Sequence, residues 1–413
     1  MYDKSIGGDL KKFSVAVTTV ALVASSAVGI AAIGAGQASA SGTKLKGSIL
    51  VGSIMPLSGA YATTGIAADN SAKLAVKYVN SHGGVLGKKL VVKYSDDDAN
   101  SATSALLFKK YVSEGAVAIL GSGDTASTTV AMADKMKVPD VGLIDDGGAA
   151  IYPNGPGKPP YPWAWSTSLN GYAVGAALGT YASKSCPNGL YVIHDNTYYG
   201  DGGLAGIETV IPGSKLKGND SINENWSSSQ PASTTLQTEV SNVIASKASC
   251  VEVWLTPQDQ ATFVELLNTA GGDSITVLGN DETNSDSTFS SLVTNAVLSK
   301  MKIVAANLKN AQNPTKADKA YAALYKKTYH VTPTVWGEIQ YDAVMILAKV
   351  INEGKSTKNT KIAAELNKLT NFPGLTGTLS FTKMIHTSIN GPQFVPVQYD
   401  GSGSSLTTWN QIK

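Results

Sequence analysis

From Ser48 onward, hydrophobic residues follow two different spacings. Short apolar runs such as Ile49 to Ile54 are typical of buried strands, whereas the apolar residues from Ala68 to Val79 recur every three or four positions, as on one face of a helix. Gly83 and Gly84 then end that helix. The pattern predicts strands at residues 49–54, 90–94, 117–120 and 141–144, and helices at 68–79, 102–114 and 127–137. This alternation predicts an α/β fold with a mostly parallel sheet covered by helices on both faces.

A proline-rich segment from Tyr152 to Trp165 interrupts the alternation and marks a loop or a boundary. After it the pattern predicts helices at 172–184, 203–210, 234–246 and 260–270, and strands at 190–193, 221–225, 251–254 and 276–278. The last portion adds helices at 316–329, 338–352 and 360–369, and short β-type runs at 377–381 and 394–399. Two consecutive α/β units of similar size predict two similar domains.

Residues 1–40 have the pattern of a secretory signal peptide. Lysines precede an apolar run from Phe13 to Ile33, and the small residues Ala38-Ser39-Ala40 follow it. We expect cleavage after Ala40; the alternative is that this long run is kept as a membrane anchor. The first cysteine is Cys186, so no cysteine lies at the signal junction to carry a lipid. The pattern therefore predicts an exported protein, periplasmic or at the cell surface, that is not lipid-anchored.

Composition narrows the class of partner. Of the 413 residues, 43% are hydrophobic and 15% are charged, and the net charge is +2, which excludes a disordered polyelectrolyte or a nucleic-acid-coating protein. All 33 basic residues are lysine. Arginine is the residue that grips carboxylates and phosphates bidentately, so its absence disfavours specialised sites for nucleotides or dicarboxylates. Lysines and helix N-termini can still hold anions.

Two cysteines in an exported protein suggest a disulfide. Cys186 and Cys250 each stand just before an apolar run, at Leu190 and at Val251. If these runs are neighbouring parallel strands, both cysteines lie at the same end of one sheet and a bridge is geometrically reasonable. Two buried free thiols are the alternative.

Catalytic motifs are sparse. The four histidines are widely spaced, and there is no phosphate-binding loop, nucleophile elbow or paired Cys-x-x-Cys, so we expect neither a metal nor an enzyme. The run Asp96-Asp97-Asp98 could form a cation site, but a solvated turn after a strand is the favoured interpretation. The ligands of a metal ion must converge on one point, which consecutive residues of one backbone do not readily do.

One motif favours an enzyme. Gly121-Ser122-Gly123-Asp124-Thr125-Ala126 follows a predicted strand and opens a predicted helix, and Asp145 stands about twenty residues further on, which is the spacing of a dinucleotide site. The motif follows the third strand rather than the first, and an exported protein meets little reduced nicotinamide. An exported NAD-dependent oxidoreductase is therefore an alternative interpretation, and the first interpretation needs no cofactor.

The order and spacing of several modest motifs carry a further signal. These motifs are Ile49 to Tyr61, Asn80 to Leu90, Tyr94 to Asp98, His194 to Gly200 and Tyr341 to Ala343. Together they resemble the type I solute-binding proteins of ABC importers, the branched-chain amino-acid-binding (Leu/Ile/Val-binding) family. The similarity covers essentially all of the expected mature chain.

The resemblance implies two Rossmann-like lobes joined by three crossovers and closing on a ligand around a hinged cleft. Lobe one is expected at residues 43–167 and 308–377, and lobe two at 168–307 and 378–413. Ligands of open α/β sheets bind at the carboxyl ends of the strands. The loops expected there include the one that begins at Thr256.

Family roles transfer to single positions of this chain. Tyr61 resembles the aromatic residue at the mouth of the cleft, and Tyr199 resembles a cleft tyrosine of the second lobe. Ser122 and Thr125 fall where the family holds a ligand carboxylate, although capping of a helix would also explain them. Asp281 aligns with the acid that meets the ligand ammonium, with capping of a turn as the alternative.

The sequence departs from the family pattern at Asp145-Asp146-Gly147, where the family commonly has small residues with a hydroxyl. Two carboxylates at an expected carboxylate site would repel an anionic ligand group. A neutral amide, a polyol-like compound or a cation therefore becomes a better ligand than an ordinary α-amino acid.

These observations predict a monomeric, non-enzymatic receptor that delivers a small polar molecule, such as an amino acid, an amide or a related compound, to the permease of an ABC importer. A ligand-sensing receptor of the same fold, which passes its closed state to a membrane signalling partner, is the second hypothesis. The exported oxidoreductase is the third. Neither the identity of the ligand nor the choice between delivery and sensing follows from the sequence.

Overall fold

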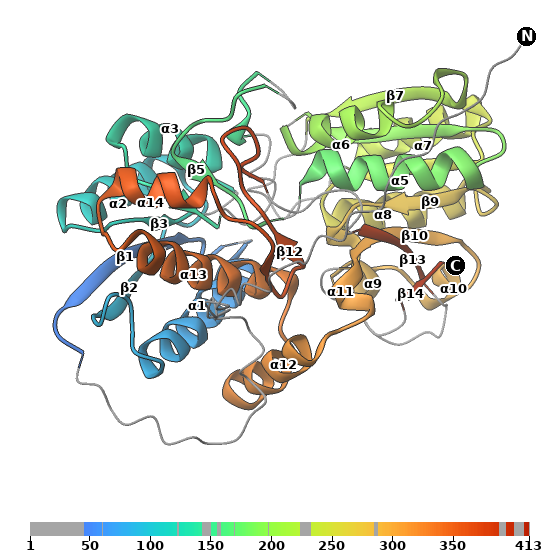
Figure 1. The fold of residues 1–413 in the computed structure, drawn as a ribbon. Coiled ribbons are helices and arrows are strands. Elements are labelled where there is room, and N and C mark those ends of the chain that lie inside the picture. The colour runs from blue at the N-terminus through green and yellow to red at the C-terminus, as the bar shows by residue number, and fades with distance from the viewer. Residues whose placement is uncertain are drawn as a thin grey trace, which may run out of the picture.

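The computed structural model describes residues 45–59, 61–121, 124–142, 150–154, 158–168, 170–196, 198–223, 233–284, 288–387, 394–399 and 409–412. Figure 1 shows two lobes side by side, each built on its own sheet with helices packed around it. The colours show that the chain builds most of one lobe, passes to the other, and then returns through the orange helices before its last strands. This two-lobed α/β architecture confirms the predicted fold class.

The first lobe contains a five-stranded sheet in the order β2-β1-β3-β4-β5, in which every neighbouring pair is parallel. Its strands are β1 (Ser48–Met55), β2 (Lys89–Asp96), β3 (Ile119–Leu120), β4 (Asp140–Val141) and β5 (Ala164–Trp165). Its helices are α1 (Ala62–Ser81), α2 (Ser101–Ser113), α3 (Ala126–Met136), α12 (Lys316–Tyr329), α13 (Val335–Gly354) and α14 (Asn359–Leu366). The apolar spacing that predicted α1 lies on its buried face, where Ala68, Ala72 and Ala75 are fully buried.

The second lobe contains a seven-stranded sheet in the order β14-β13-β10-β9-β8-β6-β7. Strands β6 to β10 pair in parallel, and β13 and β14 add antiparallel pairs at one side. Its strands are β6 (Leu190–Asp195), β7 (Leu216–Ile222), β8 (Cys250–Trp254), β9 (Thr276–Gly279), β10 (Ile303–Leu308), β13 (Phe394–Tyr399) and β14 (Trp409–Gln411). Its helices are α5 (Gly171–Ser185), α6 (Tyr198–Glu208), α7 (Ser233–Ser246), α8 (Pro257–Thr269), α9 (Thr288–Leu292) and α10 (Asn295–Leu298), with short 3-10 turns at Gly213–Lys215 and Glu282–Asn284.

The chain passes between the lobes three times, after β5, after β10 and before β13. The short helix α11 (Lys309–Gln312) directly follows β10, before the chain reaches α12 of the first lobe, and a two-stranded ribbon of β11 (Phe372–Pro373) and β12 (Thr378–Leu379) precedes the third passage. Residues beyond this ribbon stay with the first lobe, because the Phe381 amide donates to the Leu369 carbonyl at 2.8 Å. The last passage therefore begins beyond Phe381, later than the boundary predicted at 377/378.

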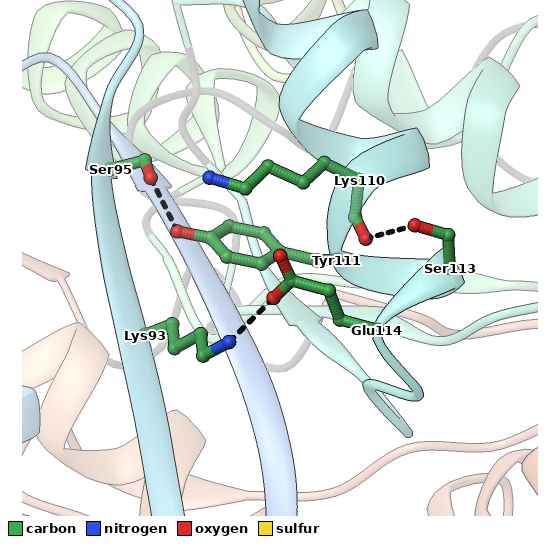
Figure 2. Close-up of polar contacts among 6 residues, drawn as sticks. All are labelled: Lys93, Ser95, Lys110, Tyr111, Ser113 and Glu114. Carbon is green, nitrogen blue, oxygen red and sulfur yellow. Dashed lines mark hydrogen bonds and ion pairs between the residues drawn. The ribbon is translucent and has the colours of Figure 1, made fainter.

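Polar contacts fasten α2 to the outer strand of the first sheet (Figure 2). The Tyr111 hydroxyl lies 2.5 Å from the Ser95 hydroxyl on β2, and the Lys93 ammonium pairs with the Glu114 carboxylate at 2.7 Å. The ring of Tyr111 is fully buried beneath these contacts. The aromatic ring thus supplies apolar packing, while its hydroxyl meets a polar partner at the sheet edge.

Cys186 and Cys250 are joined in a disulfide, with their Cα atoms 5.8 Å apart. Cys186 directly follows α5, and Cys250 opens β8, which pairs in parallel with β6. The neighbouring-strand arrangement expected from the sequence is therefore present, and the bridge lies at the amino ends of these strands.

Candidate functional site

A cavity of about 160 Å³ lies between the lobes at the carboxyl ends of the second-lobe strands β9 and β10. One wall comes from the loop after β9 and from the end of β10, and the facing wall comes from the beginning of α13 in the first lobe. Its polar lining residues are Asp281, Asn284, Asn307, Thr334 and Glu338. Position and polarity together make this cavity the candidate ligand site.

The Asp281 carboxylate forms part of the second-lobe wall. It is 5% exposed, and its Oδ1 accepts a hydrogen bond from the Tyr199 hydroxyl at 3.0 Å. Tyr199 in turn packs edge-on against Trp254, with ring centroids 5.2 Å apart. Burial raises the pKa of Asp281 to about 6, and the hydrogen bond from Tyr199 opposes that rise. Asp281 is thus a desolvated acid at the edge of a cavity, and its carboxylate is held by Tyr199, which itself packs on Trp254.

A buried amide network fixes the backbone beside Asp281. The Gln260 side chain, on α8, donates to the Leu255 carbonyl at 2.6 Å and to Asn280 Oδ1 at 3.0 Å. The Thr283 hydroxyl donates to Gln260 Oε1 at 2.5 Å, and the Glu282 amide donates to Asn280 Oδ1 at 3.0 Å. Because every member of this network is tied to another, the loop that carries Asp281 is held in place before any ligand arrives.

The facing wall depends on how α13 is anchored in the first lobe. The Gln340 side chain donates to the Gly142 carbonyl after β4 at 2.5 Å, and the Thr167 hydroxyl after β5 donates to the Ile339 carbonyl at 3.1 Å. These bonds fix the first turns of α13 against the end of β4 and the start of the first passage between the lobes. They thereby position Glu338, which lies in the first turn, at the cavity.

Glu338 is an acid without a counter-charge. Burial and, to a smaller extent, the neighbouring carboxyls of Asp342 and Asp318 raise its pKa to about 8. Within the described ranges its carboxylate has no hydrogen-bond donor and no cationic partner. The cavity therefore brings two acids together from opposite lobes, Asp281 and Glu338.

A family model described as periplasmic binding protein matches residues 48–402 of the 413-residue chain. The chain belongs to the periplasmic binding protein family. The match covers the strands of both lobes up to β13, so it agrees with the two sheets and the cavity between them. It favours a receptor over the exported oxidoreductase that the Gly121 motif suggested.

Solved structures of low sequence identity share the fold of this periplasmic binding protein. A periplasmic binding protein type 1 from Bordetella pertussis Tohama I has a TM-score of 0.77 at 19% identity, covering 88% of this chain and 100% of its own. The branched-chain amino acid transporter substrate-binding protein LivJ from Streptococcus pneumoniae, solved with isoleucine, has a TM-score of 0.70 at 19% identity, covering 89% and 99%. A solute-binding protein of an ABC transporter from Rhodopseudomonas palustris BisB5, solved with 3,4-dihydroxybenzoic acid, has a TM-score of 0.68 at 19% identity, covering 89% and 98%. No curated protein matches the chain by sequence.

Of the predicted site residues in the second lobe of this periplasmic binding protein, Asp281 lines the cavity, and Tyr199 donates a hydrogen bond to the Asp281 carboxylate. Thr256 precedes α8, where its hydroxyl accepts a hydrogen bond from the Asp259 amide at 3.3 Å, so its hydroxyl caps a helix. The roles of all three toward a ligand remain predictions.

In the first lobe, the Thr125 hydroxyl is fully buried and lies 3.1 Å from Asp97 Oδ2, to which it donates. The Ser104 hydroxyl donates to the same carboxylate oxygen at 2.5 Å. Asp97 thus secures the turn after β2 from a fully buried position, so the solvated turn that the sequence predicted for the acidic run holds only for the exposed Asp96 and Asp98. Tyr61 is partly buried and immediately precedes α1. The predicted residues Ser122, Asp145, Asp146 and Gly147 lie outside the described residues.

Sequence reasoning did not identify Glu338 and Thr334 as site residues. No local pattern marks these two residues, because their place at the cavity depends on the contacts that anchor the start of α13 to segments far away in the chain. The described residues contain no group of three or more potential metal ligands. Among the helices of those same ranges, none is both long enough and apolar enough to cross a bilayer.

Proposed function

We propose that this periplasmic binding protein is an exported receptor that binds a small polar molecule between its two lobes and delivers it to the permease of an ABC importer. The observation that carries the proposal is the interlobe cavity, which joins Asp281 of one sheet to the first turn of α13 in the other lobe. A ligand that contacts both walls binds the closed form better than the open form, and so shifts the population toward closure.

The comparisons support delivery as the role of this site. LivJ from Streptococcus pneumoniae was solved with isoleucine, and another transporter binding protein was solved with 3,4-dihydroxybenzoic acid. The neighbours thus bind ligands of different chemistry on one fold, so the ligand of this chain has to be found from its own cavity. We propose further that residues 1–40 are a cleaved signal, that the mature receptor acts as a monomer, and that it is not an enzyme.

A thermal-shift screen tests the proposal. The purified protein is heated with amino acids, amides, hydroxylated aromatic acids and alkylamines in turn. A ligand present at 100 times its Kd stabilises the folded state by about 2.7 kcal/mol, which raises the Tm by a few degrees. The same compound should reduce the radius of gyration in small-angle X-ray scattering, because the lobes close on it.

Two variants locate the binding. Asp281→Asn keeps the shape of the side chain but removes its charge, and it should abolish or strongly reduce the Tm shift. Asp273→Asn makes the same change at an exposed position of the same lobe and should leave the shift intact. A panel in which no compound changes either the Tm or the radius of gyration would overturn the receptor function.

A further inference from the structure

The charge of the interlobe cavity is one-sided. Asp281 and Glu338 are its two ionisable lining residues within the described part of the chain, and none of the lining residues there is lysine or histidine. The chain contains no arginine at all. An anionic ligand group would therefore find no cationic side chain among these lining residues, whereas a cationic group would find one acid on each wall and would favour the ionised form of both.

Polar groups on the first-lobe wall also lack partners. Thr334 is the residue that precedes α13, a position where a hydroxyl commonly accepts a hydrogen bond from the helix backbone, but it makes no such bond here. Its Oγ1 is buried and has no hydrogen-bond partner among the described residues. The Glu338 carboxylate is also without a donor within those ranges. A buried polar atom without a partner is costly, and the Thr334 hydroxyl is such an atom. Together with the unpaired Glu338 carboxylate beside it in the cavity wall, it indicates that a ligand supplies the missing hydrogen bonds.

We propose that the ligand of this cavity is a small organic cation, an alkylamine or an amidinium compound, whose N–H groups donate to Asp281 from the second lobe and to Glu338 from the first. This inference rests on the proposed receptor function and adds the chemical class of the ligand.

Closure follows from this arrangement, because each lobe contributes one carboxylate. In the open form a cation can contact only one of the two carboxylates. In the closed form it can contact both, and closure also expels water from the cavity. Charge-assisted hydrogen bonds are stronger in a cavity without water, because the local dielectric constant is lower there. The amide network behind Asp281 and the anchored start of α13 hold the two acids before binding, so little ordering is needed when the cation arrives.

Proton release provides an independent signature. Without a ligand, burial and the acids Asp342 and Asp318 keep Glu338 largely protonated at pH 7. Around Asp281, the facing groups are the Tyr199 hydroxyl and the fully buried Glu252, whose pKa burial raises well above its usual range. A bound cation favours the ionised form of Glu338, so binding at pH 7 should release a proton, and affinity should rise as the pH increases from 6 toward 9.

Isothermal titration calorimetry of the purified protein tests the inference. The cationic probes are 1-aminobutane, 1,4-diaminobutane and butylguanidine; the neutral probe is 1,4-butanediol, and the zwitterion is leucine. At least one cation should bind at a single site, and the diol should bind at least tenfold more weakly. The binding heat at pH 7 should depend on the ionisation enthalpy of the buffer, because a proton is released.

Matched variants assign the effect to the cavity. Glu338→Gln and Asp281→Asn should each weaken cation binding by roughly tenfold or more, since each leaves a desolvated charge without its partner. Glu338→Gln should also reduce the number of protons released. Glu353→Gln makes the same change near the other end of α13, where the side chain is exposed, and should alter neither quantity. Unchanged Tm values show that the variants fold.

Three results would overturn the inference: that none of the cations binds, that the diol binds as tightly as the best cation, or that Glu338→Gln leaves cation affinity unchanged. Leucine or an amide binding in place of the cations would leave the receptor function standing while removing the cationic ligand. If instead no compound of any class shifts the Tm or closes the lobes, the receptor function falls as well.

Discussion

At the scale of single residues, Gly52 decides whether the first sheet can pack against α2. It lies in the middle of β1, and a Cβ placed on it would come within 2.3 Å of Tyr111 Cδ2 and within 2.9 Å of Ile119 Cδ1. The Tyr111 ring cannot easily move away, because it is fully buried and its hydroxyl is held by Ser95. The position therefore has no room for even one methyl group.

We expect Gly52→Ala to lower the free energy of unfolding by about 1–3 kcal/mol, the usual cost of overpacking a core. Urea denaturation followed by circular dichroism measures the change. Gly213→Ala is the matched control, because a Cβ there meets nothing within 4 Å, and it should stay within about 0.5 kcal/mol of the wild type. Equal stabilities for the two variants would show that the Tyr111 ring moves aside without cost.

Single site residues differed in how far the sequence could predict them. Asp281 was assigned from the family resemblance, and its place two residues after β9 agrees with the rule that such folds bind ligands at strand ends. Thr125 was expected to hold a ligand carboxylate, but its hydroxyl is bonded to Asp97, a contact between residues far apart in the chain that no local pattern indicates. Glu338 was counted only as the start of a helix, since its place in the cavity depends on contacts between α13 and the first passage between lobes.

At the scale of elements, the disulfide joins the end of α5 to the beginning of β8 across 64 residues of chain. Closing a loop of that length removes conformational entropy from the unfolded chain that corresponds to about 4 kcal/mol in the chain-entropy model, and measured effects are typically about 2–4 kcal/mol. The bridge lies at the amino ends of its strands, whereas the cavity lies at the carboxyl ends. Its effect should therefore fall on stability and leave binding unchanged.

The double variant Cys186→Ala/Cys250→Ala tests this separation. We expect a loss of about 2–4 kcal/mol in the free energy of unfolding, with ligand affinity within twofold of the wild type. A reductant should destabilise the wild type by a similar amount and leave the double variant unaffected, because the chain has no other cysteine. Two free thiols on labelling of the native protein, or a reductant without effect, would contradict the bridge.

Long elements with a clear apolar spacing were predicted well, and elements at sheet edges were not. The helix predicted at 338–352 is α13, which extends only a few residues further at each end. The strand predicted at 221–225 is β7, Leu216–Ile222, which lies at the edge of its sheet and alternates exposed with partly buried residues. An edge strand needs few apolar residues, so its position depends on pairing with β6 rather than on its own composition.

At the scale of the whole molecule, the first and third passages between the lobes run side by side. Ser166 and Thr387 form a parallel bridge, and the Ser166 amide donates to the His386 carbonyl at 2.8 Å. The His386 ring stacks on Trp165, with centroids 4.6 Å apart, and its Nδ1 lies 2.8 Å from the Ala164 carbonyl. His386 is 1% exposed, so the hinge region contains a buried histidine where two separate segments of chain meet.

Acid should loosen this junction through His386. Burial lowers the pKa of His386 to about 4, from 6.5 in the unfolded chain. Between these values the unfolded chain binds the additional proton, so stability falls as the pH drops from about 6.5 toward 4, by up to about 3 kcal/mol. Urea denaturation at pH 7 and at pH 4.5 measures the difference. Asn cannot bind a proton, so in His386→Asn the part of the stability loss that comes from protonating His386 should disappear. This holds even if the variant is less stable than the wild type at pH 7.

The buried acids respond to pH in the opposite sense. Burial raises the pKa values of Asp281 and Glu338, so their contribution to stability increases as the pH falls. They are present in both proteins, and subtracting the pH dependence of the variant from that of the wild type therefore isolates the histidine. His330→Asn is the control, because His330 is exposed in a left-handed conformation that asparagine tolerates, and it should keep the wild-type dependence. Identical pH dependence in His386→Asn and the wild type would mean that acid acts on the two lobes elsewhere than at the junction of the passages.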